Sequence, residues 1–582
     1  MTLELTSATY RYAGYARPAI HDVDLRLDDG EIVGLVGANE AGKSTICLVA
    51  SGLAPASIGG GLTGSLVIDG EPMAGRPVHD LAERVAIGFQ DPATQRSGIA
   101  ATVFEEVALG PMNLGLPTHE TIARAREALT LLRIGDLADR DPSRLSGGQG
   151  QLVAIASLLA MRPRHIVLDE PTAQLDPEGT RLVAAALRDV ARAGTALLVV
   201  EHKTDLLDGL CGRIVVVADG RIVADGPTAA VLDDPRLEAW GVEPPSRVRL
   251  ARAFAARGLD PALAAPVPDP APAAPVPDPA PRGGTGVTAA PTTNGPRPAA
   301  APTRDPRGAA VRLTGLAYVY PEGTRALDGV DLEIAQGEVV AVVGQNGSGK
   351  STLVRHLNGL LRPTEGTVAI LGDDAASLRV AALAARVGLV FQEPDRQIFA
   401  RKVRSEVAFG PSNLGRRGVD LDRAVDEALD AVGLADQATA NPYDLGYSRR
   451  KLLSIASILA MRPPIVVLDE PTTGQDLRGV ARVRAIVAAL VAEGRTVIAV
   501  SHDMRFVAET FGRVIVLRAG RIVLDGTPAD VFAESGWPTL ASTYLEPPLA
   551  ARVGARLGVG STPTEAAVVE ALAARAGRRA QL

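Results

Sequence analysis

The sequence contains one long pattern twice, and this duplication limits the folds open to the chain. GANEAGKST at residues 37–45 recurs as GQNGSGKST at residues 344–352. Further along, HIVLDEPT at residues 165–172 recurs as IVVLDEPT at residues 465–472. Because the order of the segments is kept, the chain is predicted to hold two copies of one folding unit rather than a single larger domain.

Each copy alternates short apolar runs with amphipathic stretches. EIVGLVG (31–37), HIVLDE (165–170) and ALLVVEH (196–202) are predicted to be buried strands. TIARAREALTLLRI (121–134) and EGTRLVAAALRDVARAG (178–194) are predicted to be amphipathic helices. Strands that alternate with helices in this way indicate an α/β fold with a largely parallel sheet in each copy.

Proline and alanine dominate the stretch between the two copies. It contains AAPVPDPAP twice in succession, at residues 264–281. A segment of this composition cannot bury a core, so we expect an extended, mostly disordered linker. The predicted organisation is a first copy, a Pro/Ala-rich linker, a second copy and a C-terminal helical extension, at residues 1–248, 249–310, 311–545 and 546–582.

Composition excludes several other kinds of protein. The 582 residues carry a net charge of −7 and only 3% aromatic residues, so neither electrostatics nor base stacking favours a nucleic-acid partner. Two cysteines are too few for a disulfide framework or a cysteine zinc ribbon. No apolar run approaches the ~20 residues that span a bilayer, and the first residues lack the apolar segment of a signal peptide. We expect a cytoplasmic protein that depends on a partner for any work at a membrane.

Both copies contain the pattern of a phosphate-binding loop, in which two glycines bracket four residues and Lys-Ser follows. Each loop follows an apolar strand and precedes a helical segment, which is the context that the motif requires. Glycines let backbone N–H groups surround phosphates, the lysine reaches the β- and γ-phosphates, and the serine hydroxyl binds Mg²⁺. The predicted nucleotide-binding residues are Gly37, Asn39, Gly42, Lys43, Ser44 and Thr45 in the first loop, and Gly344, Asn346, Gly347, Ser348, Gly349, Lys350, Ser351 and Thr352 in the second.

An Asp-Glu pair ends one apolar strand in each copy, as Asp169-Glu170 and Asp469-Glu470. Two acids at the end of an apolar strand are costly in a protein core, which argues for a chemical role. The aspartate suits Mg²⁺ binding, and the glutamate suits orienting or deprotonating an attacking water.

RLSGGQGQ at residues 144–151, between these motifs, resembles the signature motif of ATP-binding-cassette ATPases. The LDEPT segments fit the same family, as do two D-loops (174–176 and 474–476) that follow them. The resemblance implies two tandem P-loop NTPase domains that use ATP and Mg²⁺, each with a helical subdomain that carries the signature segment. It also implies head-to-tail pairing within the chain, in which each ATP lies between the P-loop of one copy and the signature segment of the other.

The resemblance assigns roles to further residues of this sequence. Tyr12 and Tyr320 resemble the aromatic residue that stacks on adenine, and the signature residues are Ser146, Gly147, Gly148 and Gln149. The implied catalytic residues are Glu170 and Glu470, the switch histidines His202 and His502, and the Q-loop glutamines Gln90 and Gln392. The implied Mg²⁺ ligands are Ser44, Gln90, Asp169, Ser351, Gln392 and Asp469.

The second copy lacks a good signature segment. It has LGYSR at residues 445–449 where the first copy has LSGGQ at residues 145–149, and Glu40 in the first P-loop stands where the second has Gly347. A tyrosine in the place of a glycine hampers the close backbone approach that a phosphate needs. With head-to-tail pairing, both departures fall on the site of the first P-loop. We expect one competent ATP site, which uses Glu470, and one impaired site; equal turnover at both sites stays open.

A further pattern narrows the kind of ATPase. FQDPATQ and FQEPDRQ, at residues 89–95 and 391–397, are each followed by Glu-Val-Ala-x-Gly-Pro-x-Asn-Leu-Gly. This combination resembles the energising ATPases of energy-coupling-factor importers, which take up vitamins, their precursors, or cobalt and nickel ions. The resemblance implies a transmembrane coupling subunit that contacts these segments, a separate substrate-capture membrane subunit, and a place on the cytoplasmic face of the membrane.

Other proteins with cassettes fit the sequence less well. A tandem-cassette ATPase of a sugar importer also has an asymmetric pair and stays open as an alternative. A soluble translation factor with two cassettes would be expected to have a charged, helical linker, and the Pro/Ala-rich linker disfavours it. A DNA-repair cassette protein would need a long coiled-coil insertion, for which the interval between Lys43 and Ser146 is too short. The sequence predicts no particular cargo.

Overall fold

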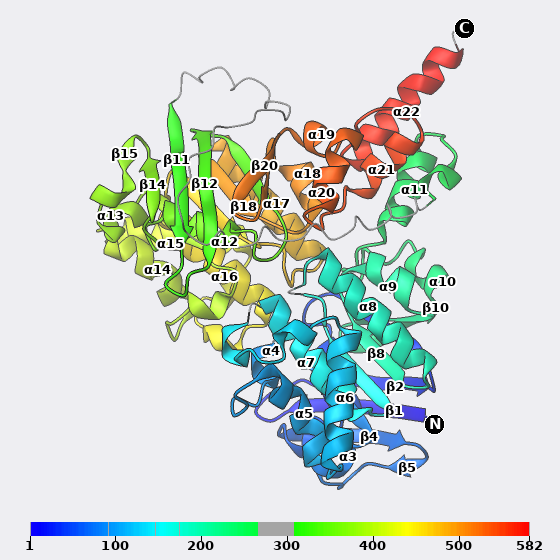
Figure 1. The fold of residues 1–582 in the computed structure, drawn as a ribbon. Helices are drawn as coiled ribbons and strands as arrows, with labels where there is room; N and C mark the ends of the chain where they lie inside the picture. Colours follow the sequence, from blue (N-terminus) through cyan, green and yellow to red (C-terminus); the bar gives the residue numbers. More distant parts are fainter. Residues whose placement is uncertain (1, 91, 146, 174, 266–307, 581–582) are drawn as a thin grey trace, which may run out of the picture.

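The computed structural model describes residues 2–90, 92–145, 147–173, 175–265 and 308–580. Within these ranges the two copies form two lobes, the first repeat coloured blue to green and the second green to red (Figure 1). Each repeat contains a six-stranded sheet and a separate four-stranded antiparallel sheet. The α/β prediction is confirmed, and the antiparallel sheet is an addition that the alternation of strands and helices did not predict.

The six-stranded sheet of the first repeat has the order β10-β9-β3-β8-β7-β6. All neighbours run parallel except the β9–β10 pair at one edge. Its strands are β3 (Ile32–Gly37), β6 (Val85–Gly88), β7 (His165–Asp169), β8 (Ala196–Val200), β9 (Arg213–Ala218) and β10 (Arg221–Pro227). The antiparallel sheet, of order β2-β1-β4-β5, consists of β1 (Thr2–Tyr12), β2 (Ile20–Asp28), β4 (Gly60–Ile68) and β5 (Glu71–Pro72).

The central strands are apolar because both of their faces are covered. Every residue of β3, β7 and β8 is buried. Along β3, Val33 and Leu35 pack into the core shared with the antiparallel sheet, whereas Ile32 and Val36 pack on the opposite, helical side. A strand buried on both faces has no position for a solvated side chain, so it shows an unbroken apolar run.

Helices cover both faces of this sheet. Helix α1 packs between the two sheets, and α8 and α9 pack on the other face, next to a subdomain made of α5, α6 and α7. The helices of the first repeat are α1 (Lys43–Ala50), α2 (Leu53–Ala56), α3 (Val78–Ala82), α4 (Pro92–Gln95), α5 (Val103–Asn113), α6 (Thr118–Leu131), α7 (Gly147–Met161), α8 (Pro177–Arg192), α9 (Thr204–Leu210) and α10 (Thr228–Leu232). Among the described residues, no helix has the length and apolar character needed to cross a bilayer.

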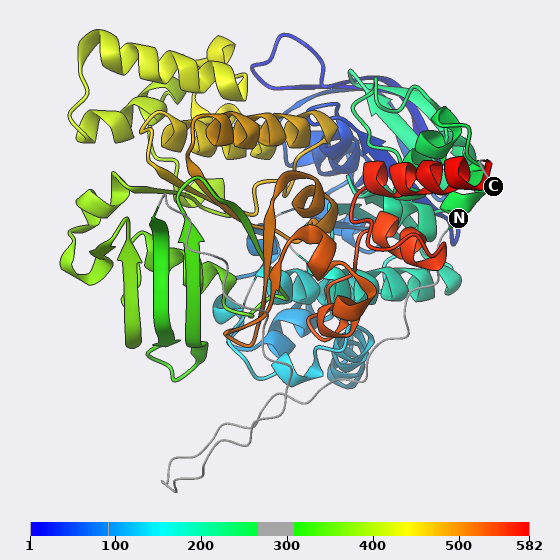
Figure 2. The same ribbon diagram turned by 90° about the horizontal axis from the view of Figure 1, so that it is seen from above.

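The second repeat has the same architecture, with sheet orders β16-β17-β18-β13-β19-β20 and β12-β11-β14-β15. Figure 2 shows its antiparallel strands, in green, as a layer of their own. The strands are β11 (Ala309–Val319), β12 (Arg325–Ala335), β13 (Val339–Val343), β14 (Glu365–Ile370), β15 (Asp373–Asp374), β16 (Val387–Val390), β17 (Ile465–Asp469), β18 (Thr496–Val500), β19 (Arg513–Arg518) and β20 (Arg521–Gly526). The helices are α12 (Lys350–Leu357), α13 (Val380–Ala384), α14 (Val403–Asn413), α15 (Gly418–Val432), α16 (Tyr447–Leu459), α17 (Leu477–Ala492), α18 (Met504–Thr510), α19 (Pro528–Val531) and α20 (Trp537–Ala541).

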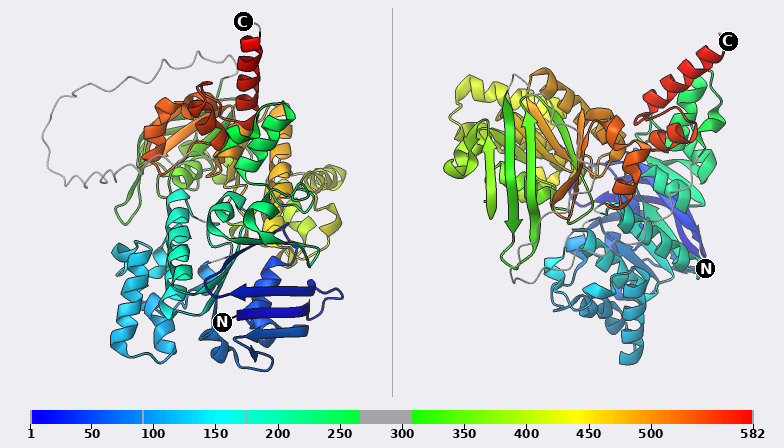
Figure 3. Two further views of the ribbon diagram at one scale, coloured as in Figure 1. Left: turned by 90° about the vertical axis from the view of Figure 1, so that its right-hand side faces the viewer. Right: turned by 45° about the horizontal axis from the view of Figure 1, so that its top comes forward.

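The ends of the two repeats combine into one helical body. Helix α11 (Ser246–Ala256) follows the first repeat, and α21 (Leu549–Arg556) and α22 (Glu565–Ala580) follow the second. The three helices lie side by side (Figure 3) and share a core that includes Phe254 and Val568. The predicted linker therefore begins too early: residues 246–264 form α11 and a short 3₁₀ helix (Pro261–Ala264), and the rest of the linker prediction, at residues 266–307, lies outside the described residues.

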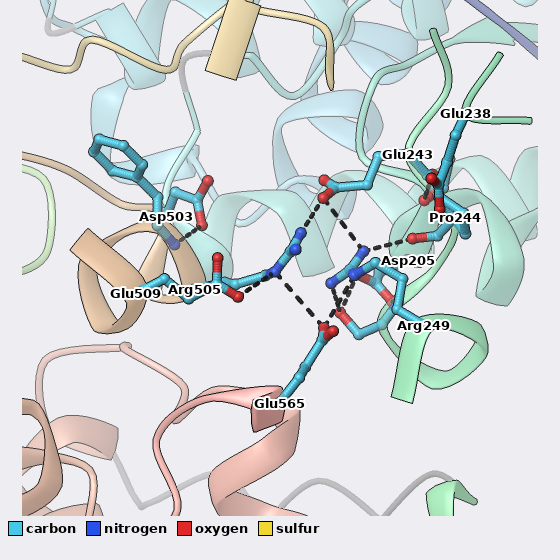
Figure 4. A network of polar contacts seen from close by, with 12 residues as sticks. Asp205, Glu238, Glu243, Pro244, Arg249, Asp503, Arg505, Glu509 and Glu565 are labelled. Carbon is cyan, nitrogen blue, oxygen red and sulfur yellow. Dashed lines mark hydrogen bonds and ion pairs between the residues drawn. The ribbon is translucent and has the colours of Figure 1, made fainter. Parts of the chain in front are cut away.

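A network of charged side chains ties this helical body to the second repeat (Figure 4). Arg505 on α18 pairs with Glu243 from the tail of the first repeat and, at 2.9 Å between Nε and Oε1, with Glu509. Glu565 at the start of α22 accepts from Arg249 Nε at 3.0 Å and lies 3.6 Å from Arg505 Nε. Helix α18 begins two residues after His502, the predicted switch histidine of the second repeat. The network therefore connects α11 and α22 to the segment that contains His502.

Candidate functional site

Both P-loops connect a central strand to a helix, β3 to α1 and β13 to α12, at the carboxyl end of the parallel strands. Lys43 Nζ donates to the carbonyls of Gly37 at 3.0 Å and Ala38 at 2.8 Å. Lys350 makes the equivalent two contacts at 2.7 and 2.8 Å. Burial lowers the pKa of both ammonium groups. Each lysine is therefore held inside its loop, where an anion would lie.

The first turn of each helix after a P-loop is open for a phosphate. Gly42 and Gly349, which precede α1 and α12, have φ of 105° and 104°. A Cβ at these positions would lie 2.9 Å from the carbonyl oxygen of Ala19 and 2.5 Å from that of Ala326, so only glycine fits. Neither helix start has a side-chain cap, which leaves backbone N–H groups for an anion. The loops thus fit the triphosphate of ATP.

Of the predicted Mg²⁺ ligands, the serine and the aspartate lie together in each repeat. The Ser44 hydroxyl is hydrogen-bonded to the Asp169 carboxylate, and Ser351 to Asp469. Burial raises the pKa of Asp169 to about 6 and also raises the pKa of Asp469. Among the described residues, the buried Oδ1 of Asp469 finds no hydrogen-bond partner. A serine hydroxyl beside an under-coordinated buried carboxylate is a donor set that suits Mg²⁺.

The two predicted catalytic glutamates share a strained backbone. Glu170 and Glu470 have φ of 51° and 50°, in the left-handed region that residues other than glycine rarely adopt. Their N–H groups donate to the carbonyls of Val200 and Val500, both at 3.0 Å, which holds the strained conformation in place. Such strain concentrates at functional sites, because it serves to aim a side chain.

The surroundings of the two glutamates differ. Glu170 Oε2 accepts from Gln90 Nε2 at 2.8 Å, and His202 Nε2 lies 3.2 Å from Oε1. Burial alone would raise the pKa of Glu170, but His202 and Gln90 help to hold it below its usual value. His502 Nε2 lies 3.1 Å from Glu470 Oε1, and the backbone N–H of His502 donates to Glu470 Oε2 at 3.2 Å. Burial raises the pKa of Glu470 to about 7. Burial also lowers the pKa of His502 well below its usual value.

The D-loops reach across to the P-loop of the other repeat. Asp476 Oδ2 accepts from the backbone N–H of Asn39 at 2.8 Å, and the Asn39 amide donates to the carbonyl of Gly474 at 3.2 Å. In the opposite direction, Asp176 Oδ2 accepts from the backbone N–H of Asn346 at 3.5 Å. These reciprocal contacts have the head-to-tail geometry that the resemblance implied.

The two departures from the family motifs meet at the first P-loop. Arg449 Nη2 lies 2.9 Å from Glu40 Oε2, and a Cβ at Gly446 would lie 3.4 Å from Glu40 Oε1. Glu40 adopts φ of 62°, in the same left-handed region as Gly347 at 79°. The carboxylate of Glu40 is therefore turned toward the altered signature segment and is paired there with a guanidinium.

The two altered residues before Arg449, Tyr447 and Ser448, contact residues of their own repeat. The Ser448 hydroxyl is buried and donates to Gln475 Oε1 at 2.8 Å, and Gln475 Nε2 donates back to the Ser448 carbonyl at 3.1 Å. The Tyr447 hydroxyl donates to the carbonyl of Gln392 in its own repeat at 3.4 Å. Both side chains thus bind within the second repeat.

The intact signature segment is described in part. Gly147 begins α7, followed by Gly148 and Gln149 in its first turn, so this glycine-rich turn lies at a helix start. Ser146 and the D-loop residue Gln174 lie outside the described residues.

The predicted adenine-stacking tyrosines touch their P-loop helices. The hydroxyls of Tyr12 and Tyr320 lie 3.1 and 3.0 Å from Oγ1 of Thr45 and Thr352, respectively. Both rings are half-buried and lie edge-on to a neighbouring tyrosine. The tyrosines are thus brought to the P-loops with their rings in fixed orientations.

Sequence reasoning missed a pair of glutamines that tie the Q-loop to the signature helix. Gln95 accepts from the backbone N–H of Phe89 at 3.3 Å and donates to the carbonyl of Ala154 in α7 at 3.2 Å. Gln397 makes the same two contacts with Phe391 and α16, at 3.2 and 3.0 Å. The signal was present, because these residues are the last glutamine of both FQ-x-P-x-x-Q segments.

The sequence profile of the family described as "ABC transporter" matches residues 20–173 and 327–473, which include both P-loops and both Asp-Glu pairs. The chain belongs to the ABC transporter family. It is similar to a "Putative ABC transporter ATP-binding protein" of Methanosarcina acetivorans, with 36% identity over 95% of this chain and 89% of that protein. Each repeat is accordingly an ATP-binding cassette, and the chain is a two-cassette ATP-binding component that uses ATP and Mg²⁺.

Two solved structures are similar to parts or most of the chain. The structure of cbiO1 from Clostridium perfringens, described as part of the ABC transporter complex cbiONQ, is 33% identical and covers 43% of this chain and 96% of its own, with a TM-score of 0.38. The archaeal ribosome recycling factor aABCE1 covers 90% of each chain at 21% identity and a TM-score of 0.55. The second likeness concerns the tandem-cassette fold alone.

Proposed function

We propose that this protein is the energising ATPase of an energy-coupling-factor type importer, with one competent and one impaired ATP site. The observation that carries the site assignment is that both departures from the family motifs fall on one site, where Glu40 pairs with Arg449. The second P-loop instead faces the first cassette, whose signature segment keeps the family pattern. We therefore assign turnover to the site of the second P-loop.

In this proposal the second P-loop binds the triphosphate through Lys350 and the open N-terminus of α12. Ser351, Asp469 and Gln392 would hold Mg²⁺, which neutralises phosphate charge when bound. Tyr320, whose hydroxyl lies 3.0 Å from Oγ1 of Thr352 in the same helix, would stack on the adenine.

Glu470 orients and deprotonates the attacking water. Its pKa of about 7 gives a base matched to neutral pH, because a proton acceptor works best near the operating pH. His502 is neutral, since burial lowers its pKa, and its backbone N–H donates to Glu470 Oε2 at 3.2 Å, which holds the carboxylate in position. The signature turn at the start of α7 closes the site from the opposite cassette and excludes water.

In this proposal, the first P-loop faces no intact signature turn that could close its site. Tyr447 and Arg449 occupy the segment where a serine and a glycine turn would approach the phosphate, and Arg449 already binds Glu40. Glu170 is engaged by Gln90 and His202, so less of its carboxylate is available to a water. This site is proposed to bind ATP with slow or no turnover.

The importer part of the proposal is supported by a matching apolar surface on both cassettes. Around the paired Pro-x-Asn-Leu-Gly segments, the first cassette exposes Ile99 (79%) and Met112 (58%). The second exposes Phe399 (57%) and Phe409 (49%), whose ring centroids are 4.6 Å apart, together with Leu414 (37%). Exposed apolar clusters of this kind mark interaction sites. They suit the cytoplasmic helices of a transmembrane coupling subunit.

The docking proposal is tested by co-expression with the membrane subunits. Asn113 and Asn413 are exposed at the ends of α5 and α14, so Asn113→Glu and Asn413→Glu place charges on the surface without disturbing a core. We expect the double variant to lose most membrane recovery while the free chain keeps its ATPase rate. Val523→Glu, equally exposed on β20, is the matched control. Unchanged recovery of the double variant would overturn the docking assignment.

A further inference from the structure

A lysine is completely buried beside the ATP machinery of the second cassette, and no nucleotide contact explains it. Lys451 has an exposed fraction of 0% and lies in α16, one turn after the altered signature segment. A buried ammonium is costly unless each of its hydrogens finds an acceptor. The contacts of Lys451 therefore indicate why the chain keeps a charge there.

All three hydrogens of the Lys451 ammonium are taken up by backbone carbonyls. Nζ donates to Phe391 O at 3.1 Å, to Gln392 O at 2.5 Å and to Asp469 O at 3.0 Å. Three acceptors match the three donors of an ammonium. Two of them belong to residues whose side chains are the proposed Mg²⁺ ligands, on the Q-loop and at the end of β17.

The first cassette lacks this brace. Its α7 has Gln151 at the corresponding position, equally buried at 3% exposure. The Oε1 of Gln151 finds no hydrogen-bond partner among the described residues. A glutamine amide has two donors and cannot satisfy three carbonyls at once. The three-carbonyl contact is therefore found in the cassette whose P-loop site is proposed to be competent, and the described residues show no equivalent in the other cassette.

Two further hydrogen bonds link α16 to the Q-loop segment. Gln397 is bonded to α16 through the Ser454 carbonyl at 3.0 Å, and Tyr447 donates to Gln392 O at 3.4 Å. Lys451 alone of these three also binds the carbonyl of Asp469 on the neighbouring strand. It links the Q-loop to the Asp-Glu pair one residue beyond the parallel pairing of β16 and β17, which ends at Val390 and Leu468.

We infer that Lys451 is a positioning residue for the competent ATP site, because it holds the backbone of Gln392 and Asp469 at a fixed separation so that their side chains meet one Mg²⁺. The inference rests on the proposed function, in which the site of the second P-loop carries turnover. A catalytic group displaced by about 1 Å can lose ~10²-fold in rate, so a brace on two metal ligands has a measurable effect.

The test compares Lys451→Met, Lys451→Gln and Lys451→Arg in the full-length chain. For each variant, kcat, the KM for ATP and the Mg²⁺ concentration for half-maximal ATPase are measured at fixed ATP. We expect Lys451→Met to lower kcat about tenfold and to raise the Mg²⁺ requirement several-fold, with the KM for ATP changed less than twofold. Lys451→Arg, which keeps the charge and its donors, should recover part of both losses.

The Mg²⁺ requirement separates positioning from general stability. Loss of folded protein lowers the rate but leaves the Mg²⁺ requirement of the remaining molecules unchanged, and that pattern would overturn the inference. If Lys451→Met does not fold, Lys451→Gln carries the test with the side chain that the first cassette already accommodates. Gln151→Met is the matched control, and its Mg²⁺ requirement should equal that of the wild type.

Glu470→Gln distinguishes failure of this inference from failure of the proposed function. If Glu470→Gln abolishes turnover while Lys451→Met has wild-type kcat and Mg²⁺ requirement, the positioning role is wrong and the site assignment stands. If Glu470→Gln itself leaves turnover intact, the site assignment is wrong and the inference falls with it.

Discussion

The P-loops of the two cassettes make matching contacts, whereas the segments that the opposite cassette contributes differ. Lys43 and Lys350 contact the same two carbonyls of their loops, and both helices begin without a side-chain cap. Across the first P-loop, however, a protein–protein ion pair joins Glu40 to Arg449. At the second P-loop, Gly347 stands in the place of Glu40, and the first cassette contacts the loop through Asp176, which accepts from the backbone N–H of Asn346. The P-loop elements are kept in both cassettes, and the signature segments that the other cassette contributes differ in sequence.

The same division extends to the glutamates behind the P-loops. Glu170 is hydrogen-bonded to Gln90 and its pKa is held below the usual value, whereas burial raises the pKa of Glu470 to about 7. The better proton acceptor therefore lies at the site that faces the intact signature segment. Two independent features, one from each cassette, favour the same site.

The largest effect expected is from Glu470→Gln. Loss of a general base costs ~10²- to 10⁴-fold, so steady-state ATPase of the assembled transporter should fall by at least ~10²-fold. Glu170→Gln is the matched control and should cost less than about threefold, because its site already lacks the signature serine. Equal losses from the two variants would mean that the sites are equivalent or obligately coupled, and the asymmetry would be refuted.

Ser146→Ala should reduce ATPase almost as strongly, although Ser146 and Glu470 belong to different cassettes. Removal of one donor to a transition-state phosphate costs ~10²-fold. Ser448→Ala is the matched change in the second cassette and should leave turnover within about twofold, because the Ser448 hydroxyl is bonded to Gln475 in its own cassette. The comparison is made by single-turnover ATPase, with ATP binding measured separately. A larger loss for Ser448→Ala than for Ser146→Ala would reverse the assignment of the two sites.

Local motifs made much of this site predictable, because contiguous residues build it. Lys43 and Ser44 begin α1 directly after the loop that follows β3, and Glu170 follows the end of β7, so the pattern of the sequence already contains their neighbours. The backbone strain at Glu170 could not be predicted, since it depends on a hydrogen bond to a different strand, at Val200. The same holds for Gln95, whose partner in α7 is brought close only by the fold.

The remaining differences arise between distant segments. The sequence showed Glu40 and the altered segment at residues 445–449 as two separate departures. Only the packing of one cassette on the other pairs them. Likewise, α11 was hidden in a stretch predicted as linker, because the apolar partners that stabilise it, including Val568, come from the far end of the chain.

Restoring the family motif should sharpen the comparison. Residues 446–449 would be changed from GYSR to SGGQ together with Glu40→Gly, in a Glu470→Gln background where residual turnover comes from the first site. Because the new signature turn supplies donors to the phosphate, residual ATPase should rise by about tenfold. Adding Glu170→Gln should remove the gain. No rise, in a protein that still binds ATP, would mean that the impairment lies elsewhere than in these motifs.

The smallest expected effect is the change in ATP affinity at the first site when the Glu40–Arg449 ion pair is broken. The direction of that change is what tests the comparison. Glu40 is a carboxylate at the rim of a triphosphate site, and Arg449 at 2.9 Å offsets its charge. Arg449→Gln should weaken ATP binding at the first site, because an unpaired carboxylate repels phosphate. Glu40→Gln should strengthen it, because the freed guanidinium attracts phosphate, and the double variant should return close to the wild type. Both groups are partly exposed, so each shift should be about 1 kcal/mol or less and should shrink at high salt.

Equilibrium binding of Mg-ATP in a Lys350→Ala background, where the second site is disabled, measures the four affinities. Shifts of the same sign in both single variants would show that the pair acts by holding the cassettes together rather than by balancing charge at the phosphate.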